Sequence, residues 1–587
     1  MGIEEISKQK GNFALTAHLD DYHATYGSYD AKNHAHEIEY FEGGTLNVAH
    51  NALDRHMKTW RKNKVALIHE IADKEGKIAK SEKLTYQDLS FQSNKFANVL
   101  KTLGIKKGER VFIFLPRVPE VYISFFGTLK VGAVASTLFA AFGSEAIYDR
   151  LSNSKAKMII VSPELKPRVD EVAKRLPDLT YIMVVGEKEK EMKGGMPIEV
   201  RYEEEMAKAS DRFACEHMAP SDPCFMLYTS GTTGKAKGVM HTHGALIQQH
   251  MTAKWVLDMH DEDIYWCTAD HGWVTGIVYG MIGPFSTGTT SLVYDGRFDP
   301  EKWYSIIERH RVNIWYTAPT AIRMLMKGGE ELVKKYDMTS LRHIYSVGEP
   351  LNPEAVRWGM KAFGLPFHDT WWQTETGAIS ISNYPTLPIR PGSMGKAVPG
   401  VIADIVDDEG KVLPVGAEGN LALRPGWPSM MATIWGDDER YQKYFKGGWY
   451  LAGDRALKDA DGYIWFVGRG DDVIKTSGER VGPFEVESVL VSHPAIAEAG
   501  VIGKPDALRG EIVKAFVTLR DGFRATPDLE EDLKKFVKQH LAGHAYPREI
   551  SFVDSLPKTR SGKIMRRVLR AKEMGLPIGD TSTMEAD

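Results

Sequence analysis

Apolar and polar residues follow each other along the chain in blocks that predict alternating strands and helices from about residue 64. Short apolar runs predict buried strands at Val65–His69, Val111–Leu115, Met158–Val161 and Tyr181–Val185. Between them, Thr85-Tyr-Gln-Asp88 has the form of a capping box that opens a helix, and Pro119–Val131 predicts another helix. Strands that are apolar throughout and alternate with helices are typical of parallel sheets covered by helices on both faces.

The pattern changes near Arg469-Gly-Asp-Asp472, and the rest of the chain has its own set of elements. We predict helices at Glu485–Ser492 and Leu529–Leu541, and strands at Ala497–Gly503, Val513–Leu519 and Glu549–Val553. The sequence therefore predicts an α/β fold with a large N-terminal domain, residues 1–470, of mostly parallel sheets layered with helices. Residues 471–587 would form a small, mobile α+β lid domain.

Composition narrows the class of protein. Of 587 residues, 43% are hydrophobic, which excludes a disordered or fibrous chain. The 74 basic and 78 acidic side chains give a net charge of −4, so the overall charge does not indicate a nucleic-acid partner.

The cysteines and apolar stretches bear on the compartment. Three cysteines form no disulfide framework. The apolar stretch Val121–Gly143 is interrupted by Lys130, so it predicts a helix followed by a buried strand. The N-terminus lacks the apolar core of a signal peptide, and we expect a cytoplasmic protein with no membrane partner.

The strongest local signal is the run Tyr228-Thr-Ser-Gly-Thr-Thr-Gly-Lys-Ala-Lys-Gly238, which follows a predicted strand at Cys224–Leu227. Glycines let backbone N–H groups approach a phosphate closely, while hydroxyls add donors and lysines add charge. The run is not a Walker A loop, because Ala236 stands where Ser or Thr is needed, and Gly468–Val473 lacks the third glycine of a dinucleotide fingerprint. From composition alone, a solvated flexible loop accounts for the run equally well.

The order of residues in this loop resembles the signature of the adenylate-forming, AMP-binding enzymes. Further segments between Phe41 and Arg570 are similar to the AMP-forming acetyl-CoA synthetases of that superfamily: Phe41–Asn47, Asn51 with Asp54–His56, Trp273–Gly276, Tyr316–Thr320, Ser346–Pro350, Asp369–Gly377, Gly453-Asp454 and Pro557–Lys563. Departures point to a shorter, divergent branch. Phe139-Ala-Ala-Phe142 replaces Phe-Gly-Gly-Phe, Ala236 and Ala378 replace a proline and a glycine, and Pro163–Val169 lacks an arginine pair for coenzyme A phosphates.

The resemblance implies an acetate–CoA ligase that converts ATP, acetate and CoA into acetyl-CoA, AMP and diphosphate through an acetyl-adenylate, with Mg²⁺ as cofactor. The chemistry is reversible. The alternatives are a propionyl- or other short-chain acyl-CoA synthetase and a nucleotide-binding relative without turnover. The implied partners are small-molecule substrates, with regulation by a lysine acetyltransferase and deacetylase acting on Lys563.

The resemblance also implies the roles of single residues. Lys563 would bridge the substrate carboxylate and the α-phosphate, Thr374 would contact that phosphate, and Glu375 would bind Mg²⁺. The further ATP-binding residues would be Thr229, Ser230, Gly231, Thr232, Thr233, Gly234, Lys237, Gly348, Glu349, Pro350, Asp369, Thr370, Trp371, Trp372, Gln373, Asp454, Arg469 and Arg480. Asp454 would accept hydrogen bonds from the ribose hydroxyls.

The remaining implied roles concern the acyl group, CoA and the lid. The acyl pocket would comprise Trp273, Val274, Thr275, Val347 and Trp372, with the Trp372 indole excluding longer acids. Ser477 and Gly478 would contact CoA, with Lys538 or Arg548 at its nucleotide end, and Asp471 would be the hinge. Backbone carbonyls of Val491, His493 and Ile496 would form a cation site, whereas His241 and His243 would support a loop.

Structural explanations compete with some of these roles. Residues 557–572 carry seven Lys or Arg and no acid, so Lys563 could be an ordinary solvated lysine or part of a nucleic-acid patch. Asp454 could be a turn residue, and Trp372 could belong to the core. The motif favours the catalytic interpretation of Lys563.

Overall fold

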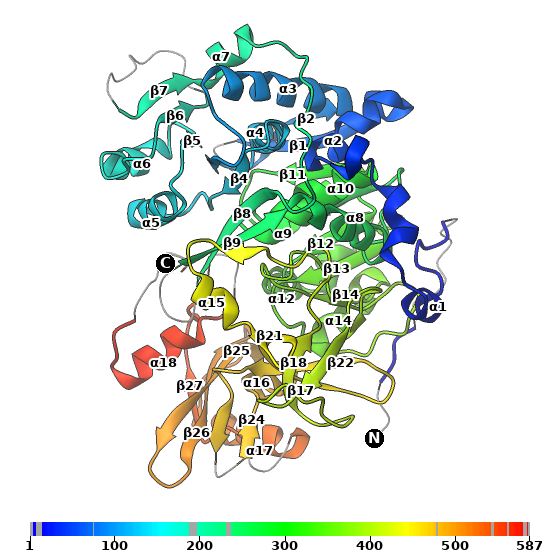
Figure 1. Ribbon diagram of the computed structural model, residues 1–587. Helices are drawn as coiled ribbons and strands as arrows, with labels where there is room; N and C mark the ends of the chain where they lie inside the picture. Colours follow the sequence, from blue (N-terminus) through cyan, green and yellow to red (C-terminus); the bar gives the residue numbers. More distant parts are fainter. Residues whose placement is uncertain are drawn as a thin grey trace.

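A computed structural model shows three sheets, and helices pack against each of them (Figure 1). The structure describes residues 4–7, 15–73, 75–186, 196–230, 236–476, 479–541, 545–559, 563–578 and 584. No helix in these ranges is long and apolar enough to span a membrane.

The first sheet is parallel over most of its width. Its strand order is β19 (Thr433–Ile434), β9 (Ala236–Thr242), β8 (Pro223–Ser230), β4 (Val134–Thr137), β3 (Arg110–Phe114), β5 (Met158–Val161), β6 (Tyr181–Val184) and β7 (Ile198–Arg201). Only β8–β9 and β9–β19 pair antiparallel among these strands. The side chains of β3 alternate between two cores: Val111 and Ile113 pack with Phe125, while Phe112 packs with Ile147 and Val169. This burial on both faces explains why the strands are apolar throughout.

The second sheet has a parallel half and an antiparallel half. The parallel half runs β14 (Phe367–Trp371), β13 (His343–Val347), β12 (Ile314–Thr317), β10 (Ile264–Cys267), β11 (Thr290–Tyr294) and β1 (Val65–Ala72), with β2 (Ile78–Thr85) antiparallel at the edge. The other half comprises β15 (Ile381–Ser382), β16 (Ser393–Ala397), β22 (Ile464–Arg469), β21 (Trp449–Lys458), β18 (Gly419–Leu423) and β17 (Ala403–Val406), with β20 (Phe445–Lys446) beside β21.

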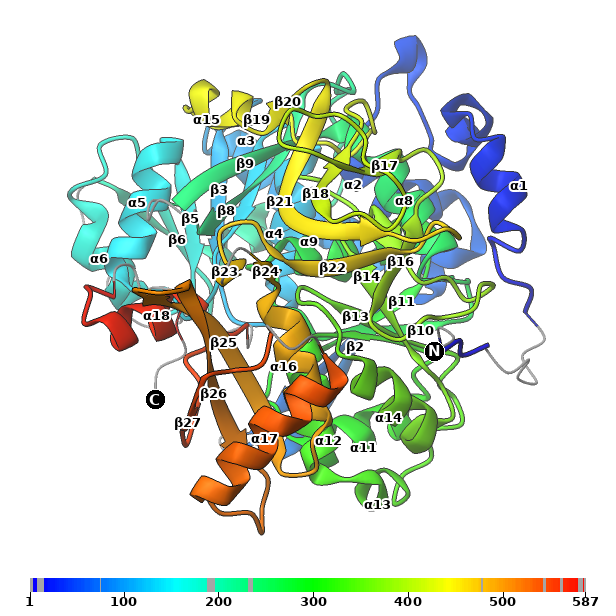
Figure 2. The same cartoon turned by 90° about the horizontal axis from the view of Figure 1, so that it is seen from below.

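The third sheet is smaller and lies in the C-terminal part of the chain. It comprises β24 (Glu479–Val481), β23 (Ile474–Thr476), β26 (Gly510–Leu519), β25 (Ile496–Asp506) and β27 (Glu549–Phe552). With α16 (Pro483–Ser492) and α17 (Pro527–His540) it encloses a core of its own, which includes Val486, Leu490, Val501, Val517 and Leu533. Figure 2 shows α16 of this C-terminal unit beside α14 (Pro353–Phe363), where the Asn352 amide donates to the Ser488 hydroxyl at 2.8 Å.

The remaining helices cover the sheets or connect strands. They are α1 (Tyr22–Gly27), α2 (Val48–Ala52), α3 (Tyr86–Thr102), α4 (Pro119–Lys130), α5 (Ser144–Ser154), α6 (Lys166–Ala173), α7 (Tyr202–Lys208), α8 (Leu246–Trp255), α9 (Val274–Ile277), α10 (Gly283–Thr287), α11 (Pro300–His310), α12 (Pro319–Gly328), α13 (Glu330–Val333), α15 (Asp438–Gln442) and α18 (Arg566–Met574).

The α/β fold and the elements predicted from the pattern are present. The strand at Met158–Val161 has the predicted bounds, α3 begins with the predicted capping box at Thr85, and α4 is followed by the buried strand β4. The antiparallel half of the second sheet was not predicted. The division at residues 470 and 471 stays a prediction.

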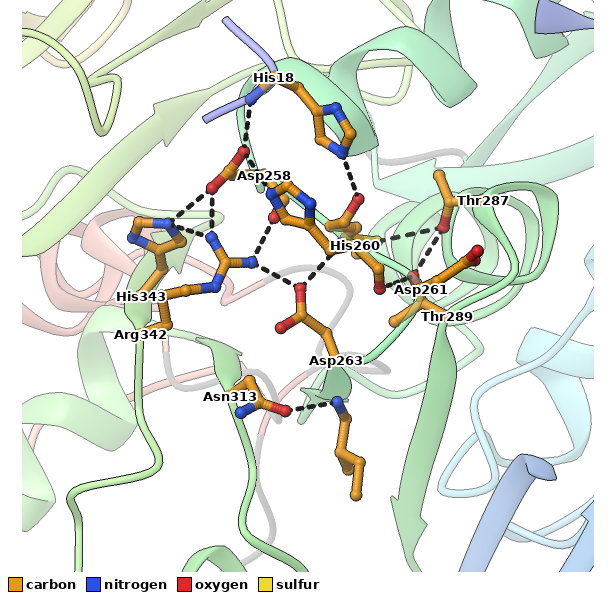
Figure 3. A network of polar contacts seen from close by, with 12 residues as sticks. His18, Asp258, His260, Asp261, Asp263, Thr287, Thr289, Asn313, Arg342 and His343 are labelled. Atoms are coloured by element: carbon orange, nitrogen blue, oxygen red, sulfur yellow. Dashed lines mark hydrogen bonds and ion pairs between the residues drawn. The ribbon is translucent and has the colours of Figure 1, made fainter. Parts of the chain in front are cut away.

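A polar network fastens the N-terminal segment to the main body (Figure 3). The backbone N–H of His18 donates to Asp258 Oδ1 at 2.9 Å, and the His18 ring stacks on that of His260 with 4.1 Å between centroids. Arg342 donates to the carboxylates of Asp258 and Asp263. Because Asp258 and Arg342 are almost fully buried, this pairing offsets the cost of burying their charges.

Candidate active site

A large cleft opens at the carboxyl ends of the parallel strands β10, β12, β13 and β14, between the two large sheets and the C-terminal unit. This edge of a parallel sheet is the usual place for a ligand in an α/β fold. The cleft volume of about 2430 Å³ exceeds the roughly 300–1,000 Å³ of a typical small-molecule site, so it has room for more than one substrate.

Most of the predicted site residues line this one cleft. They are Thr229, Lys237, Trp273, Val274, Thr275, Val347, Gly348, Glu349, Pro350, Asp369, Thr370, Trp371, Trp372, Gln373, Thr374, Glu375, Asp454, Arg469, Asp471, Val491 and Lys563. They come from chain segments more than 300 residues apart, and the fold brings them together.

Asp454 lines the cleft, and its side chain is buried. Its Oδ2 accepts hydrogen bonds from Trp371 Nε1 at 2.9 Å and from Gln373 Nε2 at 3.3 Å. Its Oδ1 lies 3.1 Å from a guanidinium nitrogen of Arg469. Burial raises the pKa of Asp454, although Arg469 and the Trp371 hydrogen bond oppose that shift. Asp454 is thus a fixed hydrogen-bond acceptor at the wall of the cleft.

The loop after β13 forms the neighbouring wall. Gly348 has a φ of 94°, a left-handed conformation that favours glycine. The Glu349 carboxylate is held by Arg323 at 2.8 Å and by the Thr320 hydroxyl at 2.7 Å. Beside this loop Asp369 is buried, and burial raises its pKa to about 7 against the hydrogen bond from Ser346. Gly348, Glu349 and Pro350 of this loop line the cleft.

Glu375 also lines the cleft, close to two hydrogen-bond donors. Its Oε1 accepts a hydrogen bond from the Tyr444 hydroxyl at 3.1 Å and forms an ion pair with Lys237. The carbonyl oxygen of Thr374 is 2.7 Å from His241 Nε2. Burial lowers the pKa of His241 to about 4, so a neutral imidazole supports this turn.

Lys563 enters the same cleft from the C-terminal unit. Its side chain is open to solvent in the cleft but surrounded by protein atoms, and this desolvation, followed by Arg469, lowers its pKa. Asp454 and Glu349 oppose that shift. Lys563 thus shares the cleft with the buried carboxylate of Asp454 and the half-buried carboxylate of Glu349. The family resemblance assigns both carboxylates to nucleotide binding.

The predicted acyl pocket has an immobilised tryptophan. Trp372 is buried, and its Nε1 donates to the Tyr316 hydroxyl at 3.3 Å. The rings of Trp372 and Tyr279 form a T-shaped pair with 5.1 Å between their centroids. The neighbouring wall residues Trp273, Val274, Thr275 and Val347 line the same cleft. A pocket closed by a ring held on two sides does not widen easily.

Some predicted residues lie elsewhere. Lys538 is outside the set that lines the cleft and lies 5.7 Å from the Tyr546 ring centroid. In the predicted cation site, the Ile496 carbonyl accepts a hydrogen bond from Arg520 at 2.9 Å, and the His493 ring contacts Asp532 at 3.1 Å. Gly231, Thr232, Thr233, Gly234, Ser477 and Gly478 fall outside the described residues, as do the side chains of Ser230 and Arg480. These roles stay predictions.

Sequence reasoning missed three residues that shape the cleft. Tyr444 contacts both Glu375 and Lys237, Tyr316 holds Trp372, and Arg566 pairs with Glu487 at 2.6 Å beside Lys563. Tyr316 was part of a quoted segment without a role. Arg566 begins a helix in the basic stretch. No pattern marks Tyr444, because a tyrosine between a short helix and a short strand carries no periodic signal.

The Glu375 carboxylate is a ligand of the kind that a magnesium ion binds. Mg²⁺ is typically held by one or two carboxylates together with substrate phosphates and waters. The Glu375 carboxylate faces the cleft next to the segment that ends β8, and the Lys237 ammonium that pairs with it is a cation in the same place.

Comparison with known proteins gives a consistent result. The family model for the AMP-binding enzyme matches residues 53–435, and that for the AMP-binding enzyme C-terminal domain matches residues 485–563. The chain is 55% identical over 569 residues to an acetyl-coenzyme A synthetase of Bacillus subtilis, covering 97% of both chains. It is 45% identical to an acetyl-coenzyme A synthetase of Methanothrix thermoacetophila, covering 93% of this chain and 86% of that one.

Solved structures of similar proteins share the architecture. A Brucella canis acyl-CoA synthetase has a TM-score of 0.74 at 35% identity, covering 95% of this chain and 99% of its own. An anthranilate CoA ligase in complex with anthranoyl-AMP has a TM-score of 0.81 at 30% identity, covering 93% and 99%. With family matches over most of its length and a relative of this identity, the chain belongs to the AMP-binding enzyme family.

Proposed function

We propose that the protein is an acetate–CoA ligase that forms acetyl-CoA, AMP and diphosphate from acetate, ATP and CoA through an acetyl-adenylate. The observation that carries this proposal is that Lys563 of the C-terminal unit and Asp454, Glu375 and Trp372 of the main body line one cleft. Two relatives that are named acetyl-coenzyme A synthetase and match nearly the full chain support the choice of acetate and CoA.

The first step joins two anions. An acetate oxygen attacks the α-phosphorus of ATP, a bond to phosphorus forms, and diphosphate leaves. Carboxylate and triphosphate repel each other, so the site has to supply positive charge and hold both groups in line. We assign the charge at the reacting atoms to Lys563, and the charge beside the phosphates to Lys237. Asp454 accepts hydrogen bonds from the ribose and fixes the nucleotide against Trp371.

Glu375 is the residue that would hold magnesium, with phosphate oxygens and water as the other ligands. When bound, the ion neutralises phosphate charge and favours the departure of diphosphate. Lys237 pairs with the Glu375 carboxylate, and the family resemblance assigns Thr374 to the α-phosphate.

The pocket sets the size of the acid. The buried indole of Trp372 blocks a chain longer than about three carbons, whereas a missing methylene costs only about 1–3 kcal/mol of binding. We therefore expect acetate to be used best, propionate to be used less well, and longer acids to be excluded. This expectation distinguishes the proposal from a synthetase for larger acids.

The second step needs a different arrangement of the C-terminal unit. The CoA thiolate attacks the acetyl carbonyl and AMP leaves, a step in which the Lys563 ammonium is no longer required beside the phosphate. We propose that rotation about Asp471 withdraws Lys563 and brings Ser477 and Gly478 toward the thiol.

Exchange of labelled diphosphate into ATP tests the proposal, with acetate, propionate, butyrate and benzoate as acids. We expect exchange with acetate, less with propionate and none with benzoate, and stoichiometric release of AMP once CoA is added. Exchange with butyrate that equals acetate would assign the protein to larger acids. Nucleotide binding without any exchange would make it a binding protein.

Modification of Lys563 offers a means of regulation. Acetylation removes the ammonium charge that the first step uses. We propose that a lysine acetyltransferase and a deacetylase act on it. Protein fully acetylated at Lys563 should lose diphosphate exchange and regain it on deacetylation, and normal exchange by the acetylated form would reject this regulation.

A further inference from the structure

Two stacked tyrosines, of which Tyr444 lines the cleft, have no part in the two steps of the proposed reaction. Tyr444 follows α15, and Tyr450 lies on β21, which pairs with β20 across a tight turn. The two rings are parallel within 5° and their centroids are 5.5 Å apart. Tyr450 is fully buried, and Trp427 packs against its other side at 5.6 Å. The stack is therefore anchored in the core at one end and reaches the cleft at the other.

The two hydroxyls of this stack contact two neighbouring residues of the cleft wall, Glu375 and Gln373. Tyr444 donates to Glu375 Oε1 at 3.1 Å and accepts a hydrogen bond from Lys237. Tyr450 donates to Gln373 Oε1 at 2.7 Å. The Gln373 amide in turn donates to Asp454 Oδ2 at 3.3 Å and to the Ala452 carbonyl at 2.9 Å.

This chain of contacts connects the phosphate side with the ribose side. At one end are Lys237 and Glu375, and at the other end is Asp454. Lysine and glutamate have long, flexible side chains, whose ordering costs free energy when a ligand has to do it. A tyrosine has only two rotatable side-chain bonds, so a stacked ring whose hydroxyl touches both groups holds them at low entropic cost.

Lys237 is held by the Tyr444 hydroxyl and by Glu375. Removal of the hydroxyl alone takes away the contacts with Lys237 and Glu375 and leaves the ring stacked on Tyr450.

We propose that Tyr444 is a positioning residue of the nucleotide site. Its hydroxyl sets Lys237 and Glu375 where the phosphates of ATP arrive, and its stack on Tyr450 keeps them in register with Gln373 and Asp454. This inference rests on the proposed function, because it assumes that the cleft binds ATP. It adds a residue that contacts neither the reacting atoms nor the acid.

The test compares Tyr444→Phe, Tyr444→Leu and wild type by calorimetric binding of ATP and of adenosine, both in EDTA. We expect Tyr444→Phe to weaken ATP binding about tenfold, the effect of one hydrogen bond to charged groups, and to leave adenosine binding unchanged. Tyr444→Leu loses the stack as well and should weaken both ligands. In diphosphate exchange, Tyr444→Phe should raise KM for ATP and leave KM for acetate unchanged.

Tyr441→Phe is the matched control, because it removes a hydroxyl from the same segment but lies outside the residues that line the cleft. Equal behaviour of Tyr444→Phe and Tyr441→Phe would overturn the inference. So would an equal loss of ATP and adenosine affinity in Tyr444→Phe, which indicates general loosening. If wild type binds no ATP even when Mg²⁺ is added, the proposed function itself fails, and that outcome is distinct from both.

Discussion

Burial shifts the ionisation of three side chains in the cleft in the direction of their neutral forms. It raises the pKa of Asp454 and of Asp369, and it lowers the pKa of Lys563. Each residue has neighbours that oppose the shift, such as Arg469 beside Asp454 and Asp454 beside Lys563. When a polyanion binds in the cleft, its negative charge should raise the pKa of Lys563 and so favour the cationic form.

The Lys563 ammonium is the first residue to test. We expect Lys563→Ala to slow adenylation, measured by diphosphate exchange, about 100-fold or more, the usual loss when a preorganised charge is removed from a transition state. Thioester formation from added acetyl-adenylate should be affected much less. Since the pKa of Lys563 is lowered, adenylation should also fall as pH rises through that pKa.

Lys572→Ala is the control for this lysine, because Lys572 belongs to the same basic stretch, on α18, but is not among the residues that line the cleft. Equal losses in the two variants would assign the effect to the basic stretch as a whole. Unchanged exchange in Lys563→Ala would remove the central residue of the proposed mechanism.

Asp369 should make stability depend on pH. The unfolded chain releases this proton near the ordinary aspartate pKa of 3.8, whereas the folded protein retains it until about pH 7. Between those values the unfolded state binds fewer protons, so stability falls as pH rises, and the contribution is fully present only below the unfolded pKa. Asp369→Asn cannot ionise. From pH 5 to 7, wild type should lose about 2 kcal/mol relative to the variant, measured by unfolding at each pH.

The pH-dependent difference between the two proteins is the decisive quantity, whatever the variant's stability at a single pH. Parallel pH profiles for wild type and Asp369→Asn would mean that the carboxyl ionises normally in the folded protein.

At the scale of elements, the strands that could be predicted are those whose sequence is apolar throughout. β3 and β5 are apolar throughout because helices cover both faces, and they were predicted within a residue of their bounds. β21 carries Gly453, Asp454 and Arg455 in its centre and has an irregular register there, so no period survives. The resemblance named Asp454, but neither the resemblance nor the pattern predicted the strand that holds it.

The segment between β22 and β23 is the place for the predicted hinge. Asp471 lies two residues after β22 ends at Arg469 and lines the cleft. Asp471→Pro fixes φ near −65° and prevents a large rotation at this residue. We expect the variant to keep diphosphate exchange within about threefold of wild type and to lose acetyl-CoA formation by about 100-fold, if closure and rotation use this residue.

Asp471→Ala provides the comparison, because alanine removes the carboxylate and keeps the backbone free to rotate. It should retain both half-reactions. A proline variant that still forms acetyl-CoA at the wild-type rate would place the hinge elsewhere, and one that loses exchange as well would indicate a distorted resting structure.

At the scale of the whole molecule, the contacts that sequence reasoning could not supply are those between distant segments. His18 reaches Asp258, which is 240 residues away, and Asp258 pairs with Arg342. None of these residues stands in a periodic pattern or in a segment quoted for the family resemblance. The cleft is likewise formed by segments that are distant in the sequence. The resemblance named most of its predicted residues, but the hydrogen bond from Tyr444 to Glu375 depends on how the chain folds back on itself.

The network around Arg342 should contribute strongly to overall stability. Arg342 is 4% exposed and is bonded to the two buried carboxylates of Asp258 and Asp263. Arg342→Met keeps the volume of the chain but leaves those carboxylates without their cation, which we expect to cost about 3–5 kcal/mol in unfolding free energy. Arg175→Met removes an arginine whose pair with Glu145 is exposed, and it should change the free energy of unfolding far less than Arg342→Met does. The cost of Arg342→Met should shrink at acidic pH, where the orphaned carboxylates can take up protons. A loss that is equally small for both arginines would mean that the buried ion pairs of Arg342 add little to the stability of the folded protein.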